Sequence, residues 1–474
     1  MTIHWIDILI FILYLSGMLA VGLYFFNKNK SKEDYYVGGR QMTAGHIGLS
    51  VVATDVGGGF SIGLGGLGFM MGLSGSWMLF TGIIVAWISA VVLIPKIYPI
   101  GKQHHLLSFP ESLKFFYDAR VALVAGVISF VGYVGFTSSQ ILAGAKLASA
   151  TFPSLSLDGA IMIMGIIAVI YTVMGGLKAV IYTDTIQWII LMVGLFLVGL
   201  PVGFYELGGW SGIQPYLPDH FLSLQNVGMI QIINWMFTIV PIWFIGMTLY
   251  QRIYACRDQR TAQRAWFIAG LFEWPVMAFL GVILGLFGRV AFEQGLFAGI
   301  GMSSTTEMDP ELGLPLFLSH VLPVGVMGLL MSAYFSAIMS TADSCLMAAS
   351  GNLITDIIGE IRQKLATSVR LSQLLTFAIG TIAIIIAMQM EQVLALMLHS
   401  YAVMVSGLLI PVVMMLLIKN PSSVAALTAM MIGGGTTLFL TLGTWVLPYG
   451  LDPIVFGLSV ALVSYVVVQF IDRL

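Results

Sequence analysis

An acidic residue stands in an apolar stretch long enough to cross a membrane. Asp55 lies in the run 49–73, whose other residues are almost all apolar or small. An ionised Asp at the centre of a bilayer costs about 2.5–3.5 kcal/mol, so it usually marks a cation or proton site. The glycines at 57–59 each lower helix stability by about 1 kcal/mol relative to Ala. An acid beside a helix break predicts a place where backbone carbonyls face an ion.

A second stretch places hydroxyl and carboxyl groups on one side of an apolar segment. Ser336, Ser340, Asp343 and Ser344 are three or four residues apart, so a helix would present them on one face. Their oxygens suit a hard cation, which prefers oxygen ligands. The alternative is that such hydroxyls bond to carbonyls of their own helix, as they often do in membranes. The spacing leaves both interpretations open.

The composition indicates a membrane protein. The chain has 474 residues, of which 58% are hydrophobic and only 9% charged, with a mean hydropathy of +0.97. A net charge of −2 gives no reason to expect a nucleic-acid partner. The predicted fold is an all-α polytopic membrane protein with about 13 transmembrane helices of roughly 20 residues or more. These windows lie near 4–26, 43–71, 75–99, 121–150, 157–177, 180–206, 228–253, 261–291, 323–357, 367–389, 391–418, 422–446 and 453–471.

The basic residues predict an orientation. If the N-terminus lies outside, all but two of the 20 Lys and Arg residues fall on the cytoplasmic side, which is a strong positive-inside pattern. The exceptions are Arg289, outside, and Lys146, within a span near its outer end. We expect Lys146 to reach the membrane interface with its charged end. Arg252 is interpreted as one of several cytoplasmic topology anchors. The N-terminus is predicted outside and the C-terminus inside.

Three motifs carry a family resemblance. They read ATDVGGG at 53–59, GGLKAVIYTDTIQ at 175–187 and SAIMSTADS at 336–344. Together they resemble the sodium:solute symporter family of proline-, glucose- and choline-type symporters, and the first and third are most similar to the choline-transporter branch. The resemblance covers essentially the whole chain.

The resemblance implies a single transporter domain over 1–474 with leucine-transporter-type inverted five-helix repeats. The repeats would be 43–206 and 228–418, with an extra N-terminal helix at 4–26 and two C-terminal helices within 422–471. The first span of each repeat is expected to be interrupted. The glycines at 57–59 supply one interruption, and Pro241 with Gly246 supplies the other.

The resemblance also implies a sodium site between the broken span and the serine-rich span. Its ligands would be the carbonyls of Ala53, Val56 and Ala337 with the side chains of Ser340 and Thr341. With the opposing broken helix and the motifs present, this is favoured over simple bonding of the two hydroxyls to their own helix.

A second sodium site is a further implication, because some family members possess one. Asp184, Asp343 and Ser344 would form it together with Ser340. The alternative role of Asp343 is a structural hydrogen bond in a hydrated inner vestibule. Asp55 is interpreted as setting the local field beside the first ion, with direct ligation or contact with a substrate amine as alternatives.

The substrate is expected at mid-membrane. The candidate binding residues are Asp55, Gly57, Gly58, Phe60, Ser139, Gln140, Asn234, Trp243, Met247, Ser400 and Tyr401. Sugar-type family members carry the pattern Trp-x3-Gln-x3-Gln-Arg, and here Met247 replaces its middle glutamine. Losing that amide disfavours a sugar, whose many hydroxyls need buried donors and acceptors. An amino acid, a quaternary amine or a monocarboxylate fits better.

The predicted function is sodium-coupled symport of a small organic solute by alternating access. The alternatives are a proton-coupled symporter and, less favoured, an ion channel. No zinc-ligand spacing such as His-Glu-x-x-His occurs, and no enzymatic activity is expected. The expected partners are the solute and the lipid bilayer, with no nucleic acid. The protein is expected to work as a monomer in the plasma membrane.

Overall fold

The computed structural model is a bundle of helices. It describes residues 4–26, 31–152, 154–300, 308–361, 369–443 and 445–473, and in these segments no β-strand forms. In these segments the structure does not describe the side chains of Asp55, Val56 and Phe60. The predictions that rest on these side chains therefore stay predictions. The first half of the chain forms α1 (Trp5–Phe26), α2 (Lys32–Val37), α3 (Ala44–Val56), α4 (Gly58–Met71), α5 (Gly82–Val92), α6 (Ile94–Gln103), α7 (Phe109–Leu113), α8 (Ala119–Thr151), α9 (Leu157–Gly194), α10 (Leu200–Glu206) and α11 (Gly209–Ile213).

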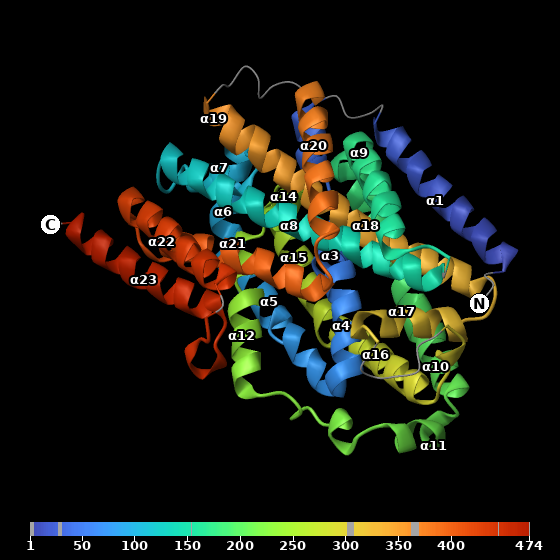
Figure 1. The fold of residues 1–474 in the computed structure, drawn as a ribbon. Helices are drawn as coiled ribbons and strands as arrows, with labels where there is room; N and C mark the ends of the chain where they lie inside the picture. The colour runs from blue at the N-terminus through green and yellow to red at the C-terminus, as the bar shows by residue number, and fades with distance from the viewer. Residues whose placement is uncertain are drawn as a thin grey trace.

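The second half continues the helical pattern. Its helices are α12 (Met229–Ile239), α13 (Ile242–Ile245), α14 (Met247–Ala255), α15 (Gln259–Leu271), α16 (Ala278–Glu293), α17 (Pro310–Val321), α18 (Val326–Gly351), α19 (Gly359–Ile361), α20 (Val369–Ala387), α21 (Val393–Leu417), α22 (Ser423–Leu442) and α23 (Pro453–Ile471). Figure 1 shows α22 and α23 at one edge of the bundle and α1 at the opposite edge. Nearly every residue of α18 is buried, so this helix forms the centre of the bundle.

Eleven helices in the described residues are long and apolar enough to cross a membrane, judged by length and composition. Two shorter apolar helices, Ala44–Thr54 and Leu157–Val173, fall inside the predicted windows 43–71 and 157–177. The multi-span character is therefore confirmed. The count of thirteen and the outside N-terminus stay predictions.

Glycine and proline interrupt the helices where the sequence predicts. α3 ends at Val56, and Gly57, with φ −1° and ψ −164°, is not helical, so α4 begins a new segment. Pro241 directly precedes α13, and Gly246, with φ −65° and ψ 114°, separates α13 from α14. Gly176 has φ 67° and ψ 170° inside α9, a left-handed conformation that glycine adopts readily. This last break separates the windows 157–177 and 180–206.

Gly57 and Gly58 also allow two segments to touch. A Cβ atom on Gly57 would collide with the Thr341 side chain, and one on Gly58 would lie 2.6 Å from Ile338 carbons. Larger residues at either position would push the junction of α3 and α4 away from α18. The same glycines therefore break the helix and permit its broken end to pack on the central helix.

A buried charge cluster ties α8, α17 and α21 together. The Lys146 side chain is 1% exposed, pairs with Asp309, and donates to Glu311 Oε2 at 2.6 Å. The Glu311 carboxylate also accepts from the backbone N–H groups of Val393 (2.9 Å) and Leu394 (3.0 Å) at the start of α21. The expectation that Lys146 reaches the interface is wrong, because α17 brings two carboxylates to it inside the protein.

Removing the cation of this buried cluster should lower the stability of the protein much more than removing the cation of a surface ion pair. Lys146→Ala should lower the free energy of unfolding by about 3–5 kcal/mol, because it leaves the Glu311 charge buried without its cation. The matched control is Lys114→Ala, which removes a surface pair with Glu360 and should cost less than about 1 kcal/mol. Equilibrium chemical denaturation in bicelles compares the two. Equal losses for both variants would contradict the structural role of Lys146.

Candidate functional site

Three of the five predicted sodium ligands meet where α3 ends against α18. The Thr341 Oγ1 atom lies 3.2 Å from the Ala53 carbonyl oxygen and 3.2 Å from the Ala337 carbonyl oxygen. The Thr341 side chain thus bonds within its own helix, as the alternative interpretation expects, and also reaches across to α3. One hydroxyl and two carbonyl oxygens therefore converge in a fully buried position.

A small cavity adjoins this junction. Its volume is about 20 Å³, which is enough for one particle of the size of a water molecule. Its lining residues are Val52, Ala53, Gly57, Ser61, Trp188, Leu191, Met277, Tyr334, Ala337 and Ile338. The carbonyl end of a helix carries partial negative charge, so the end of α3 favours a cation here. The Ala53 and Ala337 carbonyls and the Thr341 hydroxyl are oxygen ligands of the kind that a hard monovalent cation prefers.

Ser340, another predicted sodium ligand, lies in a neighbouring polar cluster. Its hydroxyl donates to Asp184 on α9, and so does the hydroxyl of Ser50 on α3. Asp184 also forms an ion pair with Arg252 on α14, at 3.2 Å between Oδ2 and a guanidinium nitrogen. Both charged side chains are essentially fully buried.

Arg252 connects the helices that surround the junction. Its guanidinium donates to Ser50 Oγ (3.0 Å) and Thr54 Oγ1 on α3, and to Ser344 Oγ (3.0 Å) on α18. The interpretation of Arg252 as a topology anchor is wrong, because anchors of that kind lie in water at the membrane surface. A planar guanidinium with five donors can hold several oxygens at once, and here they come from α3, α9 and α18.

The residues predicted for a second sodium ion separate into two groups. Asp184, Ser340 and Ser344 gather near the Arg252 guanidinium. The Asp343 carboxylate instead accepts from Thr172 Oγ1 on α9, at 2.6 Å. A guanidinium therefore stands beside Asp184, where the prediction would place an ion.

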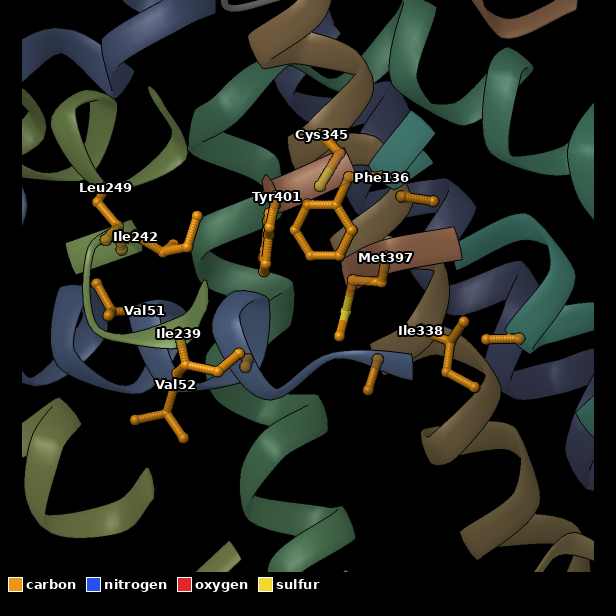
Figure 2. Packing of buried hydrophobic residues seen from close by; sticks show 14 of the residues in the cluster. Val51, Val52, Phe136, Ile239, Ile242, Leu249, Ile338, Cys345, Met397 and Tyr401 are labelled. Carbon is orange, nitrogen blue, oxygen red and sulfur yellow. The ribbon is translucent and has the colours of Figure 1, made fainter. Parts of the chain in front are cut away.

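Several of the predicted substrate residues pack against residues outside the predicted set. Tyr401 packs edge to face on Phe136, with ring centroids 4.8 Å apart, and Figure 2 shows both beside Met397. Trp243 is buried and packs against Trp266. Met247 is buried as well, and its sulfur accepts from the Phe109 backbone N–H at 3.1 Å.

Other members of that set are held by hydrogen bonds of their own. Asn234 bonds to the Gly450 carbonyl and accepts from the Asp452 N–H, so it fixes the loop before α23. The hydroxyls of Ser139 and Ser400 bond within their own helices, and the Gln140 amide donates to Ser139. The substrate assignments stay predictions.

Comparison with known proteins identifies the family of the chain. Residues 35–433 match the model of the sodium:solute symporter family. The chain belongs to the sodium:solute symporter family. The predicted family and the sodium coupling are thereby confirmed, and the protein is a sodium-coupled symporter of a small solute with multiple membrane helices.

The family members that this chain resembles differ in the solute given in their names and in the share of their length that the chain matches. The high-affinity proline transporter PutP of Bacillus subtilis is 26% identical, over 89% of this chain and 89% of its own. Sodium/glucose cotransporter 1 of Ovis aries is 27% identical, over 76% of this chain but only 59% of its own. The solved structure of a Na+-coupled sialic acid symporter covers 98% of both chains at 20% identity, with a TM-score of 0.78. It confirms the leucine-transporter-type helical fold.

Sequence reasoning missed several members of the symporter's polar cluster. Ser50 and Thr54 lie four residues apart on the same span as Asp55, so helical spacing could have placed them on one face. Thr172, the partner of Asp343, gave no signal, because a single threonine in an apolar helix usually bonds to its own backbone.

The Arg252–Asp184 pair can be measured by a double-mutant cycle. Arg252→Met and Asp184→Asn should each destabilise the protein, because each leaves one buried charge without its partner. The double variant should lose less than the sum of the two, with a coupling of about 0.5–3 kcal/mol. Equilibrium denaturation of the four proteins gives this coupling. Additive losses would contradict a direct pair.

Proposed function

We propose that the protein carries a small amino acid together with sodium across the plasma membrane by alternating access, as a monomer and without enzymatic activity. The observation that carries the sodium part is the meeting of Thr341 Oγ1 with the Ala53 and Ala337 carbonyls beside a cavity of about 20 Å³. Inward movement of one sodium ion supplies about 2.3 kcal/mol per 100 mV of membrane potential, plus the concentration term. Val56 and Ser340 complete the proposed ligand set.

One sodium ion per cycle is the stoichiometry we propose. The carboxylate of Asp184 accepts from Arg252, Ser50 and Ser340, so a resident guanidinium already balances its charge. A second sodium ion beside Asp184 would have to displace Arg252 or share a carboxylate with it. The fully buried position of Arg252 makes displacement costly, because its charge would then lack a partner.

Two observations support an amino acid as the solute. PutP and the osmoregulated proline transporter OpuE of Bacillus subtilis match this chain over 89% and 94% of their own lengths, whereas the sodium/myo-inositol cotransporter 2 of Mus musculus matches over 57% of its own. Met247 also replaces the amide that sugar-type members carry, and its sulfur is engaged by the Phe109 backbone. Quaternary amines and monocarboxylates are the next candidates.

Uptake into proteoliposomes tests this proposal. Purified protein is reconstituted, and uptake of radiolabelled proline, other small amino acids, choline, lactate and glucose is followed under an inward sodium gradient. We expect saturable, sodium-dependent uptake of one of the amino acids. Uptake driven by a proton gradient without sodium, or an unsaturable current without solute, would contradict the proposal.

The sodium ligands predict a selective effect on coupling. Thr341→Ala should raise the sodium concentration for half-maximal uptake by about tenfold, because one hydrogen-bonding oxygen in a buried site contributes roughly 1.5 kcal/mol to binding of a charged group. The solute KM at saturating sodium should change much less. The matched control is Thr151→Ala, since Thr151 is a buried threonine whose hydroxyl, among the described residues, bonds to the Leu147 carbonyl of its own helix. An unchanged sodium requirement in Thr341→Ala would show that the ion binds elsewhere.

A further inference from the structure

A larger cavity lies on another face of α18, between α1 and α9. Its volume is about 350 Å³, within the range of roughly 300–1,000 Å³ found for small-molecule pockets. Apolar side chains such as Leu15, Met18 and Phe335 form most of its lining. Ser336, Met339 and Asp343 face it from α18, whereas Ala337 and Thr341 face α3. Ser340, one of the proposed sodium ligands, also lines this cavity, so the cavity lies next to the proposed sodium site.

Several buried polar atoms in its lining have no hydrogen-bond partner within the described residues. They are Oδ2 of Asp343, Oε1 of Gln187 and the hydroxyl oxygens of Tyr171 and Ser336. The Asp343 side chain is fully buried and Gln187 is 3% exposed. The other Asp343 oxygen accepts from Thr172 at 2.6 Å, which orients the carboxylate. The hydroxyls can donate or accept, but the free Asp343 and Gln187 oxygens only accept, so the group that satisfies these two must donate hydrogen bonds.

The lining also lacks a positive charge. No Lys, Arg or His is among the described residues that line the cavity, and Asp343 has no ion-pair partner among them. A buried carboxylate requires a cation or several donors close by. An ammonium group meets both needs, because it is positively charged and has up to three N–H donors.

The outer wall of the cavity faces the surface of the bundle. Leu19 on α1 and Ile167 and Ile170 on α9 line it and are exposed. In helices that cross a membrane, such side chains contact lipid, so a ligand can enter from the bilayer with an apolar body. A phospholipid head group fits poorly, because its phosphate would find no basic partner in this lining.

We propose that this cavity binds an amphipathic primary amine. Its ammonium group donates to Asp343 Oδ2 and Gln187 Oε1, and its apolar body lies among the side chains of α1 and α9. The cavity shares Ser340 with the proposed sodium ligands but none of the residues predicted for the transported solute, so the proposal stands even if the proposed solute is wrong.

The binding test uses 4-phenylbutylamine as the probe and the uncharged 4-phenylbutan-1-ol as its neutral analogue. Both are titrated onto the purified full-length protein in phosphatidylcholine nanodiscs at saturating sodium. We expect saturable binding of the amine and binding of the alcohol that is weaker by about tenfold or more, since the charge pair is lost. Asp343→Asn should weaken amine binding by a similar factor.

Asp356→Asn is the matched control variant. Asp356 is also buried and also accepts from one hydroxyl, that of Ser108, at 2.5 Å. It lies outside the cavity lining, so its substitution should leave amine binding unchanged. Ala168→Leu, which adds bulk to the cavity lining from α9, should abolish binding without removing a charge.

Chemical labelling locates the amine on the unaltered protein, so the result does not depend on how the variants fold. Dicyclohexylcarbodiimide converts buried carboxylic acids to N-acylureas that mass spectrometry assigns to individual residues. We expect 4-phenylbutylamine to protect Asp343 and to leave labelling of Asp356 unchanged. Equal affinity for the amine and the alcohol, unchanged binding in both Asp343→Asn and Ala168→Leu, or equal effects on the two carboxyls would overturn the proposal.

Discussion

The close contact between the broken end of α3 and the central helix α18 is the constraint on which the rest of the structure depends. It requires glycine at the break, because a side chain at position 57 would collide with Thr341. It also leaves the Ala53 carbonyl within 3.2 Å of the Thr341 hydroxyl, where a continuous helix would keep its carbonyls turned along its own axis. The break therefore creates both the space and the oxygen atoms of the proposed sodium site.

Arg252 stabilises the contact between α3 and α18. It binds Ser50 and Thr54 on α3, Asp184 on α9 and Ser344 on α18. One side chain on α14 thus connects three other helices that are distant from it in sequence. Because a buried ion pair is costly to separate, we expect the helices that share Arg252 to move together during transport, while other contacts open and close. Lys146 and Glu311 give α8, α17 and α21 a comparable connection.

The sequence could predict the features that depend on local chemistry. The breaks at Gly57, Gly176 and Gly246 follow from the backbone freedom of glycine and from the neighbouring proline in the third case. The helical spans follow from apolar length, and the junction of the broken span with the serine-rich span follows from the family motifs. All of these agree with the structure.

The pairing of buried charges could not be predicted in the same way. Arg252 is 68 positions from Asp184, and Lys146 is 165 positions from Glu311, so only the packing of the helices decides that they meet. A basic residue near the end of a predicted span usually lies at the membrane surface, so the sequence alone places both Arg252 and Lys146 there. Asp343 illustrates the same limit, since its partner Thr172 belongs to another helix.

The central claim is that one sodium ion binds at the α3–α18 junction while Arg252 takes the place of a second cation beside Asp184. Equilibrium binding of ²²Na⁺ to the purified protein, counted per chain at saturation, tests this most directly. The account predicts one bound ion in the unaltered protein. Two bound ions per chain would contradict it.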